Sequence, residues 1–255
     1  MSTIAIIPAR MGSSRFPGKP LAKIHGIPMI GHVYLRTKMC SDLLETYVAT
    51  CDKEISDYIA SIGGKAVMTS SDHERCSDRT AEALLKIESS MGEQVDIVCM
   101  VQGDEPMVTP DMISQSLLPF SDTDRNIVNL MSEIMTIKEF EDPNEVKVVV
   151  DRNNHALYFS REPIPSRKKN SSNVRMLKQV CIIPFRRDYL LHFNNLKETE
   201  LELIESIDMM RILENGENVY MVKTDIETYS VDTPEDLKNV ESYMENDKLL
   251  SLYPI

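Results

Sequence analysis

Residues 8–20 combine basic and small side chains in the stretch PARMGSSRFPGKP, directly after a short apolar run. Small residues let backbone N–H groups approach phosphate oxygens, and basic residues supply positive charge to a polyanion. The small residues here are Gly12, Ser13 and Ser14, and the basic ones are Arg10, Arg15 and Lys19. By composition the stretch is predicted to hold a phosphate group; the alternative is a surface loop with incidental basic residues.

Two familiar phosphate-binding motifs do not occur in this stretch. It lacks the G-x-x-x-x-G-K-S/T pattern of a P-loop and the G-x-G-x-x-G fingerprint of dinucleotide-binding proteins. The sequence therefore argues against a P-loop protein and against a nicotinamide-dependent oxidoreductase, although the latter class also uses a doubly wound sheet.

Asp104 lies directly after the apolar run 95–101 and next to Gly103. Such a run is typical of a strand buried on both faces, so the turn would present the carboxylate at the sheet edge where ligands bind. One or two carboxylates, completed by phosphates and water, suit Mg²⁺. The alternative role for Asp104, and for Asp232 before Thr233, is an ordinary turn or helix N-cap aspartate.

The elements that would position these residues alternate between strands and helices. Strand-like runs occupy 4–9, 46–50, 66–69 and 95–101, and helical spacing occupies 27–38, 55–62 and 80–89. This order predicts an α/β fold with a doubly wound, mostly parallel sheet, in which ligands bind at the carboxyl ends of the strands.

The second half of the chain has a different pattern. Strand candidates at 146–150, 156–160 and 180–185 are closely spaced, which predicts a smaller antiparallel sheet layer within 146–190. Helices are expected at 200–215, closed by Gly216, and at 233–245, with a strand at 219–224 between them. Because no long linker interrupts the chain, residues 1–255 are expected to form one domain.

Composition narrows the class of protein. The chain is 42% apolar and 27% charged, without an apolar run long enough to cross a membrane or a signal-peptide pattern, so we expect a cytoplasmic protein with no membrane partner. A net charge of −12 argues against binding nucleic acid, which needs a basic face. The five scattered cysteines indicate reduced thiols.

Four segments, in order along nearly the whole chain, resemble the signatures of the 3-deoxy-manno-octulosonate (Kdo) cytidylyltransferase family. They are IIPAR through FPGKPL at 6–21, VQGDEP at 101–106, VKVV with ALYFSR at 146–161, and VDTPEDL at 231–237. The resemblance implies an enzyme that transfers CMP from CTP to an acidic acceptor, Kdo in the first place, and releases pyrophosphate in lipopolysaccharide biosynthesis. The preference for CTP over other triphosphates follows from the resemblance alone.

The resemblance also assigns roles to residues. It implies that Asp104 and Asp232 hold Mg²⁺ and that Arg10, Lys19 and Asp104 are catalytic, with Lys19 expected to affect turnover most. The implied nucleotide-binding residues are Ala9, Arg10, Gly12, Ser13, Ser14, Arg15, Lys19, Asp72, Ser77, Arg79 and Gln102. Proteins similar to this one are often homodimers through the smaller sheet layer, and we expect the same here.

Residues 72–79, DHERCSDR, occupy the position of a family segment close to D-H-x-S-G-T-E/D-R, which helps to position the nucleotide. The usual serine and glycine are replaced by Arg75 and Cys76, so a close backbone approach that glycine permits would be altered. Cys76 as a catalytic nucleophile is an alternative, but cytidylyl transfer needs no cysteine chemistry.

The acceptor half departs from the family. A stretch like H-L-G-I/V-Y-G/A-Y/F becomes QVCIIPF at 179–185, so the histidine is Gln179 and the tyrosine is Ile183. The stretch L-E-Q-L-R becomes IDMMR at 207–211, in which Met209 replaces the glutamine. The residues assigned to acceptor binding are Arg161, Gln179, Ile183, Asp208, Met209 and Arg211.

These changes leave two explanations open, because lost hydrogen-bonding partners weaken the selection for a sugar hydroxyl. The chain is either a divergent Kdo enzyme or a CTP-dependent relative with another acceptor, such as a different keto sugar acid or a phosphorylated small molecule that gives a CDP-linked product. A noncatalytic nucleotide-binding module is opposed by the joint presence of Arg10, Lys19, Asp104 and Asp232.

Overall fold

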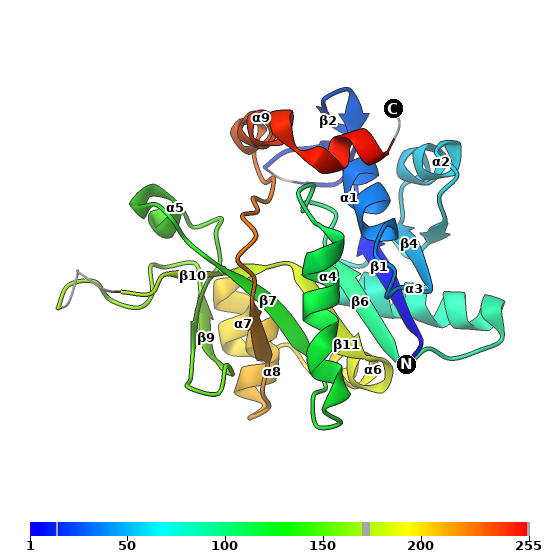
Figure 1. The fold of residues 1–255 in the computed structure, drawn as a ribbon. Helices are drawn as coiled ribbons and strands as arrows, with labels where there is room; N and C mark the ends of the chain where they lie inside the picture. Colours follow the sequence, from blue (N-terminus) through cyan, green and yellow to red (C-terminus); the bar gives the residue numbers. More distant parts are fainter. Residues whose placement is uncertain (14, 170–173, 254–255) are drawn as a thin grey trace.

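The computed structural model describes residues 1–13, 15–169 and 174–253, which build two five-stranded sheets with helices around them (Figure 1). The first sheet has the order β11-β6-β1-β4-β5, and its strands are parallel except for β11, which pairs antiparallel with β6. The strands are β1 (Thr3–Pro8), β4 (Glu45–Thr50), β5 (Ala66–Met68), β6 (Ile97–Val101) and β11 (Ile182–Arg186).

Alternate residues of β1 face opposite layers of helices, as expected of a strand buried on both sides. Ile4 and Ile6 pack in a core cluster with residues of α3 and α6. Ala5 and Ile7 pack in another cluster with residues of α1, α2 and α4. These helices are α1 (Met29–Lys38), α2 (Lys53–Ser61), α3 (Cys76–Met91), α4 (Pro110–Leu117) and α6 (Arg187–Asn195). The predicted doubly wound α/β fold is confirmed.

The second sheet has the order β12-β7-β10-β8-β9 and is antiparallel except for the parallel pair β12 and β7. Its strands are β7 (Val128–Glu133), β8 (Lys147–Val150), β9 (Ala156–Ser160), β10 (Leu177–Val180) and β12 (Tyr220–Lys223). The sheet therefore takes strands from outside 146–190 as well.

The single strand expected at 180–185 is in fact two strands that belong to different sheets. The chain leaves β10 at Val180, passes Cys181 and enters β11 at Ile182. Because residues 180–185 form one uninterrupted, mostly apolar run, their pattern gives no sign of the change of partner. This crossing brings the two sheets together beside the end of β6, where the N–H of Gln102 donates to the carbonyl of Cys181 at 3.0 Å.

The continuous helix expected at 200–215 is also wrong. Two short helices, α7 (Glu200–Glu205) and α8 (Met209–Glu214), are separated by Ser206, which has the left-handed φ of 54°. Buried Glu202 of α7 forms two hydrogen bonds with Arg211 of α8, at 2.7 and 2.6 Å. Tertiary contacts therefore override the helical periodicity, which continues through the break.

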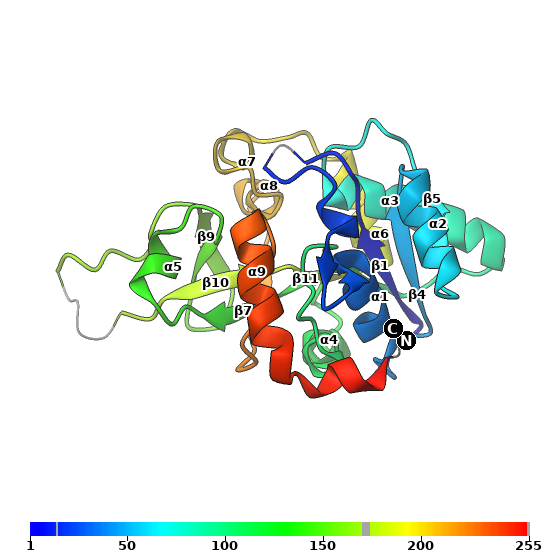
Figure 2. The same ribbon diagram turned by 90° about the horizontal axis from the view of Figure 1, so that it is seen from above.

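The C-terminal segment returns to the first sheet. Val231 and Val240 pack with Ile24 and Met29 in a small apolar cluster, and Figure 2 shows α9 (Pro234–Tyr243) next to the hairpin of β2 (Lys23–Ile24) and β3 (Ile27–Pro28). The other elements are α5 (Ile137–Glu141) and four short 3₁₀ segments, Lys19–Leu21, Leu118–Ser121, Met244–Asn246 and Lys248–Leu252. None of the described helices is both long and apolar enough to cross a membrane.

Candidate active site

Two adjoining cavities lie beyond the carboxyl ends of β1 and β6. The larger has a volume of about 320 Å³ and the smaller about 150 Å³, and the two share lining residues at the ends of several elements. The shared residues are Arg15, Gln102, Asp104, Ser206, Asp208 and Asp232. These shared residues form a common wall, so a ligand in one cavity would lie next to a ligand in the other.

Lys19 lies where three segments of the chain converge. Its Nζ donates to Asp104 Oδ2 at 2.9 Å, to Asp232 Oδ1 at 3.2 Å and to the carbonyl of Val231 at 2.8 Å. Only 13% of the Lys19 side chain is exposed. Burial disfavours its charge, but Asp104 and Asp232 outweigh burial and hold the pKa of Lys19 above its ordinary value. The site therefore contains a permanent ammonium.

Neither aspartate caps a helix. The N-cap of α9 is Thr233, whose hydroxyl accepts the N–H of Asp236 at 3.2 Å, while Asp236 accepts the N–H of Thr233 in return. The N-cap of α4 is Thr109. The carboxylates of Asp104 and Asp232 are therefore directed to Lys19, and the helix-cap role considered for both is excluded.

The two carboxylates meet the chemical requirements of a Mg²⁺ site. Both approach the same atom, so they converge on one position, and Mg²⁺ commonly takes one or two carboxylates and completes its shell with water and phosphate oxygens. Among the described residues no group of three or more His, Cys, Asp or Glu side chains could hold a metal ion. A cation bound by Asp104 and Asp232 would thus depend on substrate oxygens and water.

The loop after β1, predicted to bind phosphate, contributes two arginines in different environments to the larger cavity. Arg15 donates to Asp232 Oδ1 at 2.8 Å and to Asn144, whereas Arg10 is exposed and forms no ion pair with any residue that the structure describes. Gly12 has open space where a Cβ would be. Arg10 is therefore the cation most available to a polyanion, while Arg15 also helps to fix Asp232.

Most of the predicted nucleotide-binding residues line the larger cavity. These are Ala9, Arg10, Gly12, Ser13, Arg15, Lys19, Arg79 and Gln102. Asp72 is exposed and does not line it, and Ser77 is buried behind it, donating to Asp208 Oδ2 at 2.7 Å. Ser14 lies outside the described residues.

The segment before α3 is held by Arg79. Its guanidinium donates to Thr69 Oγ1 at 2.5 Å and to the carbonyls of Ser70 and His73 at 3.2 and 3.1 Å. Cys76 lines the cavity, but burial, with a smaller effect of Asp104, raises the pKa of its thiol to about 12. A thiol with that pKa is protonated at neutral pH, which argues against Cys76 as a nucleophile.

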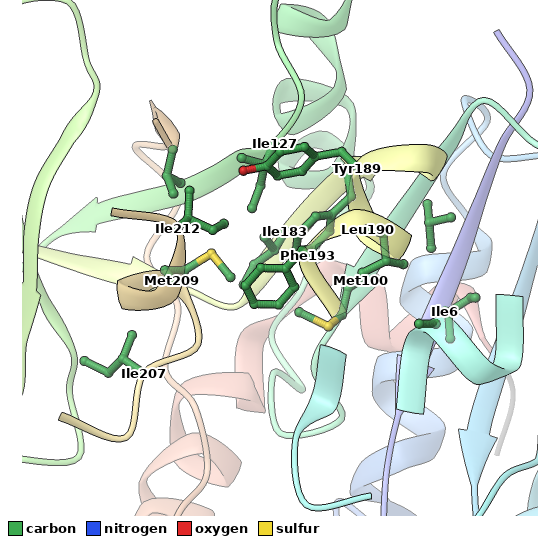
Figure 3. Close-up of a cluster of buried hydrophobic side chains, with 14 of the residues drawn as sticks. Ile6, Met100, Ile127, Ile183, Tyr189, Leu190, Phe193, Ile207, Met209 and Ile212 are labelled. Carbon is green, nitrogen blue, oxygen red and sulfur yellow. The ribbon is translucent and has the colours of Figure 1, made fainter. Parts of the chain in front are cut away.

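The smaller cavity contains five of the six residues predicted to bind the acceptor. These are Arg161, Gln179, Ile183, Asp208 and Met209. Ile183 and Met209 are each only 1% exposed and belong to the apolar cluster with Met100 and Phe193 that Figure 3 shows. They close the cavity with apolar surface and offer no polar group to a ligand.

The polar acceptor-side residues are mostly engaged within the protein. The amide nitrogen of Gln179 donates to Asn129 Oδ1 at 2.6 Å, and Arg161 donates to the carbonyls of Pro143, Glu205 and Ser206 at 2.9, 2.7 and 3.3 Å. Arg211 lies away from the cavity, in its pair with Glu202. Arg161 therefore shapes the wall of the cavity by binding backbone.

Several lining residues were not predicted from the sequence. Glu105 is buried at the crossing between the sheets, where it accepts the N–H of Cys181 at 3.0 Å, and burial raises its pKa to about 8. Asn144, Glu145 and Ser206 also line the smaller cavity. Glu105 could have been found from its place beside Asp104, but no local pattern marks Asn144 or Ser206.

Comparison with known proteins gives a consistent result. The sequence model described as cytidylyltransferase matches residues 4–226. The 3-deoxy-manno-octulosonate cytidylyltransferase of Trichlorobacter lovleyi is 42% identical over 255 residues, with 96% of this chain and 99% of that protein covered. Its counterpart in Geobacter metallireducens is 41% identical over 251 residues, with 94% and 96% covered. The solved structure of CMP:2-keto-3-deoxy-manno-octonic acid synthetase complexed with CTP has a TM-score of 0.86 and 39% identity, and the match covers 96% of this chain and 98% of that one.

Proposed function

Because this chain belongs to the cytidylyltransferase family, we propose that it transfers CMP from CTP to Kdo or a closely related keto sugar acid and releases pyrophosphate. The observation that carries the proposal is the convergence of Lys19, Asp104 and Asp232 where the two cavities meet. In such a reaction an acceptor hydroxyl oxygen bonds to the α-phosphorus of CTP while the bond to pyrophosphate breaks. The site must align the two substrates and offset the charge on the phosphate oxygens.

The chain's own residues divide this work. The larger cavity takes the nucleotide, with Arg10 bound to the triphosphate, and the smaller cavity takes the acceptor. In the substrate complex Lys19 exchanges carboxylate oxygens for phosphate oxygens and offsets the charge of the transferring group. Its position supports this role, because the Lys19 ammonium lies at the wall between the two cavities, within hydrogen-bonding distance of both carboxylates.

We further propose that Asp104 and Asp232 hold Mg²⁺ together with oxygens of the nucleotide. The donor set is suitable, and the ion, when bound, neutralises phosphate charge. Loss of turnover on chelation, restored by added Mg²⁺, would support this assignment. Turnover that persists in a chelator would contradict it.

The altered acceptor cavity favours a second candidate with the same chemistry. Ile183 and Met209 present apolar surface where family members carry tyrosine and glutamine, so the acceptor could differ from Kdo. Another keto sugar acid, or a phosphorylated small molecule that gives a CDP-linked product, would then be the substrate.

Pyrophosphate release separates these possibilities. The protein is incubated with Mg²⁺, each of the four nucleoside triphosphates, and Kdo, 8-amino-Kdo, sialic acids or small phosphorylated acids. Release with CTP and Kdo, lost in Asp104→Ala and Asp232→Ala, supports a Kdo enzyme. Release with CTP and only another acid supports the second candidate, and release with no pair contradicts both.

We propose, in addition, that the protein is a cytoplasmic homodimer that pairs through the second sheet. Leu157 on the edge strand β9 and Leu203 and Ile204 on α7 are exposed apolar side chains on that side of the molecule. Sedimentation equilibrium of the protein and of Leu157→Asp tests the pairing, and a monomeric parent protein would contradict it. Cell fractionation tests the location.

A further inference from the structure

Arg75 connects the nucleotide cavity with the acceptor cavity. The residue precedes α3 and lines the larger cavity, and its Nη1 lies 3.3 Å from Oδ1 of Asp208, which lines both cavities. Both side chains are 18% exposed. Arg75 stands where the family segment that residues 72–79 resemble usually has serine.

The carboxylate of Asp208 can accept further hydrogen bonds. Ser77 Oγ donates to its Oδ2 at 2.7 Å and Arg75 donates to its Oδ1, so each oxygen has one donor and keeps a further acceptor position. Burial raises the pKa of Asp208 above its ordinary value, and the Ser77 hydroxyl and Arg75 oppose part of that rise. The hydrogen bond from Arg75 therefore favours the ionised carboxylate in this largely buried position.

The loop that carries Asp208 is held on its other side by Arg161. That guanidinium donates to the carbonyls of Glu205 and Ser206, three and two residues before Asp208. Arg75 adds a second, charged support to the wall between the cavities.

We propose, in an inference that rests on the cytidylyl transfer proposed above, that Arg75 is a positioning residue for the acceptor. It holds the Asp208 carboxylate at the common wall, where Asp208 accepts hydrogen bonds from hydroxyl groups of a polyhydroxylated acid. Asp208 thereby selects for acceptor hydroxyl groups, which the apolar side chains of Ile183 and Met209 cannot bind. Arg75 also lines the larger cavity, but its guanidinium is paired with Asp208 and Glu198, whereas Arg10 has no ion pair among the described residues. Arg75 therefore acts on acceptor binding more than on CTP binding.

The test compares Arg75→Gln, Arg75→Lys and Asp208→Asn in steady-state kinetics with CTP and the acceptor that the parent protein uses. In Arg75→Gln the KM for the acceptor rises about tenfold or more, as for one charge-assisted hydrogen bond, while the KM for CTP stays within about twofold. Arg75→Lys restores part of the loss. The double variant Arg75→Gln with Asp208→Asn is no worse than Asp208→Asn alone, because the two residues act together.

The matched control is Arg187→Gln on α6. Arg187 is 17% exposed and pairs with Glu88, and neither residue lines either cavity. The substitution therefore removes a comparable ion pair and is expected to leave both KM values unchanged. A thermal melt of each variant checks folding.

Failure of the role of Arg75 and failure of the proposed cytidylyl transfer give different results. A rise in the KM for CTP with no rise for the acceptor overturns the positioning role and makes Arg75 a nucleotide ligand. If Arg75→Gln and Arg187→Gln change the two KM values equally, the effect of Arg75 is one of general stability. That outcome also overturns the inference. If the parent protein turns over no acceptor with CTP, the proposed function fails, and this inference fails with it.

Discussion

The ammonium of Lys19 lies 2.9 Å from Oδ2 of Asp104, although the two residues are 85 positions apart in the chain. The contact closes the loop after β1 against the turn after β6, and Asp232 joins it from the segment before α9. Three segments that all follow strands of the two sheets thus meet at one atom.

Lys19→Met is expected to lower kcat by about 100-fold or more, because it removes the cation that we propose offsets phosphate charge in the transition state. The KM for CTP changes less, since Arg10 remains. Pyrophosphate release at saturating CTP and acceptor measures kcat. Lys65→Met is the control, because Lys65 is exposed and pairs with Glu45 away from the cavities. A kcat close to that of the parent protein would exclude Lys19 from the reaction.

Asp104→Asn and Asp232→Asn are expected to raise the Mg²⁺ concentration for half-maximal activity. Loss of a residue that only supports a metal ligand weakens metal binding by roughly tenfold to hundredfold. Loss of a ligand itself should have at least that effect. A Mg²⁺ titration of pyrophosphate release measures it, with Asp57→Asn on the exposed face of α2 as the control. Unchanged Mg²⁺ dependence in both variants would place the metal elsewhere.

The cysteine next to Arg75 is expected to be unreactive. Because burial raises the pKa of the Cys76 thiol to about 12, iodoacetamide at pH 8 should label it far more slowly than an unhindered thiol. Cys76→Ala should keep kcat within about threefold of the parent, since no thiolate takes part. Peptide mass spectrometry follows the labelling. Rapid labelling together with a large loss of kcat would restore the nucleophile alternative.

Stability should fall with acidification partly through His32. This buried side chain has Nε2 2.8 Å from the carbonyl of Ile24 and Nδ1 2.8 Å from the Tyr253 hydroxyl, and burial, with a smaller effect of nearby Arg36, lowers its pKa to about 4. The unfolded chain binds this proton near pH 6.5 and the folded one only near pH 4, so acid favours unfolding between the two. The contribution is fully present above pH 6.5, and up to about 3 kcal/mol is lost toward pH 4.

Urea unfolding at pH 7.0, 5.5 and 4.5 tests the role of His32. His32→Gln should be less stable at pH 7.0 but should lose about 2 kcal/mol less than the parent protein on acidification. His192→Gln, which replaces an exposed histidine, should follow the parent. Parallel acid profiles for all three proteins would show that His32 carries no part of the loss.

The sequence was sufficient to predict that Lys19 and Asp104 lie close together, because the basic loop and the carboxylate each follow a recognisable strand of the parallel sheet. The catalytic roles expected for both residues came from the family resemblance and stay predictions. The role of Asp232 depended on resemblance, because Thr-Pro-Glu-Asp after it is equally typical of a helix start. The structure resolves that ambiguity, since the capping box uses Thr233 and Asp236.

The acceptor side could not be predicted to the same depth, because its geometry depends on contacts distant in sequence. The break at Ser206 interrupts an apolar spacing that suits one helix. It is stabilised by the pair of Glu202 and Arg211 and by Arg161, which follows β9. Arg211 was expected to bind the acceptor, but its guanidinium is paired with Glu202 instead. The contact between Arg75 and Asp208 joins residues 133 positions apart, and no local sequence pattern indicates it.

Restoring the family tyrosine in Ile183→Tyr is expected to destabilise the protein by about 1–3 kcal/mol, because Ile183 is 1% exposed and packed against Met100 and Phe193. Urea unfolding measures the loss, and Ile183→Val, at about 0.5–1.5 kcal/mol, is the control for a small change at the same position. A tyrosine accommodated without cost, with a higher kcat/KM for Kdo, would mean that the cavity can still open toward a Kdo hydroxyl. The expected loss would mean instead that the core has closed over this position, so that acceptor selection must come from the polar wall at Asp208.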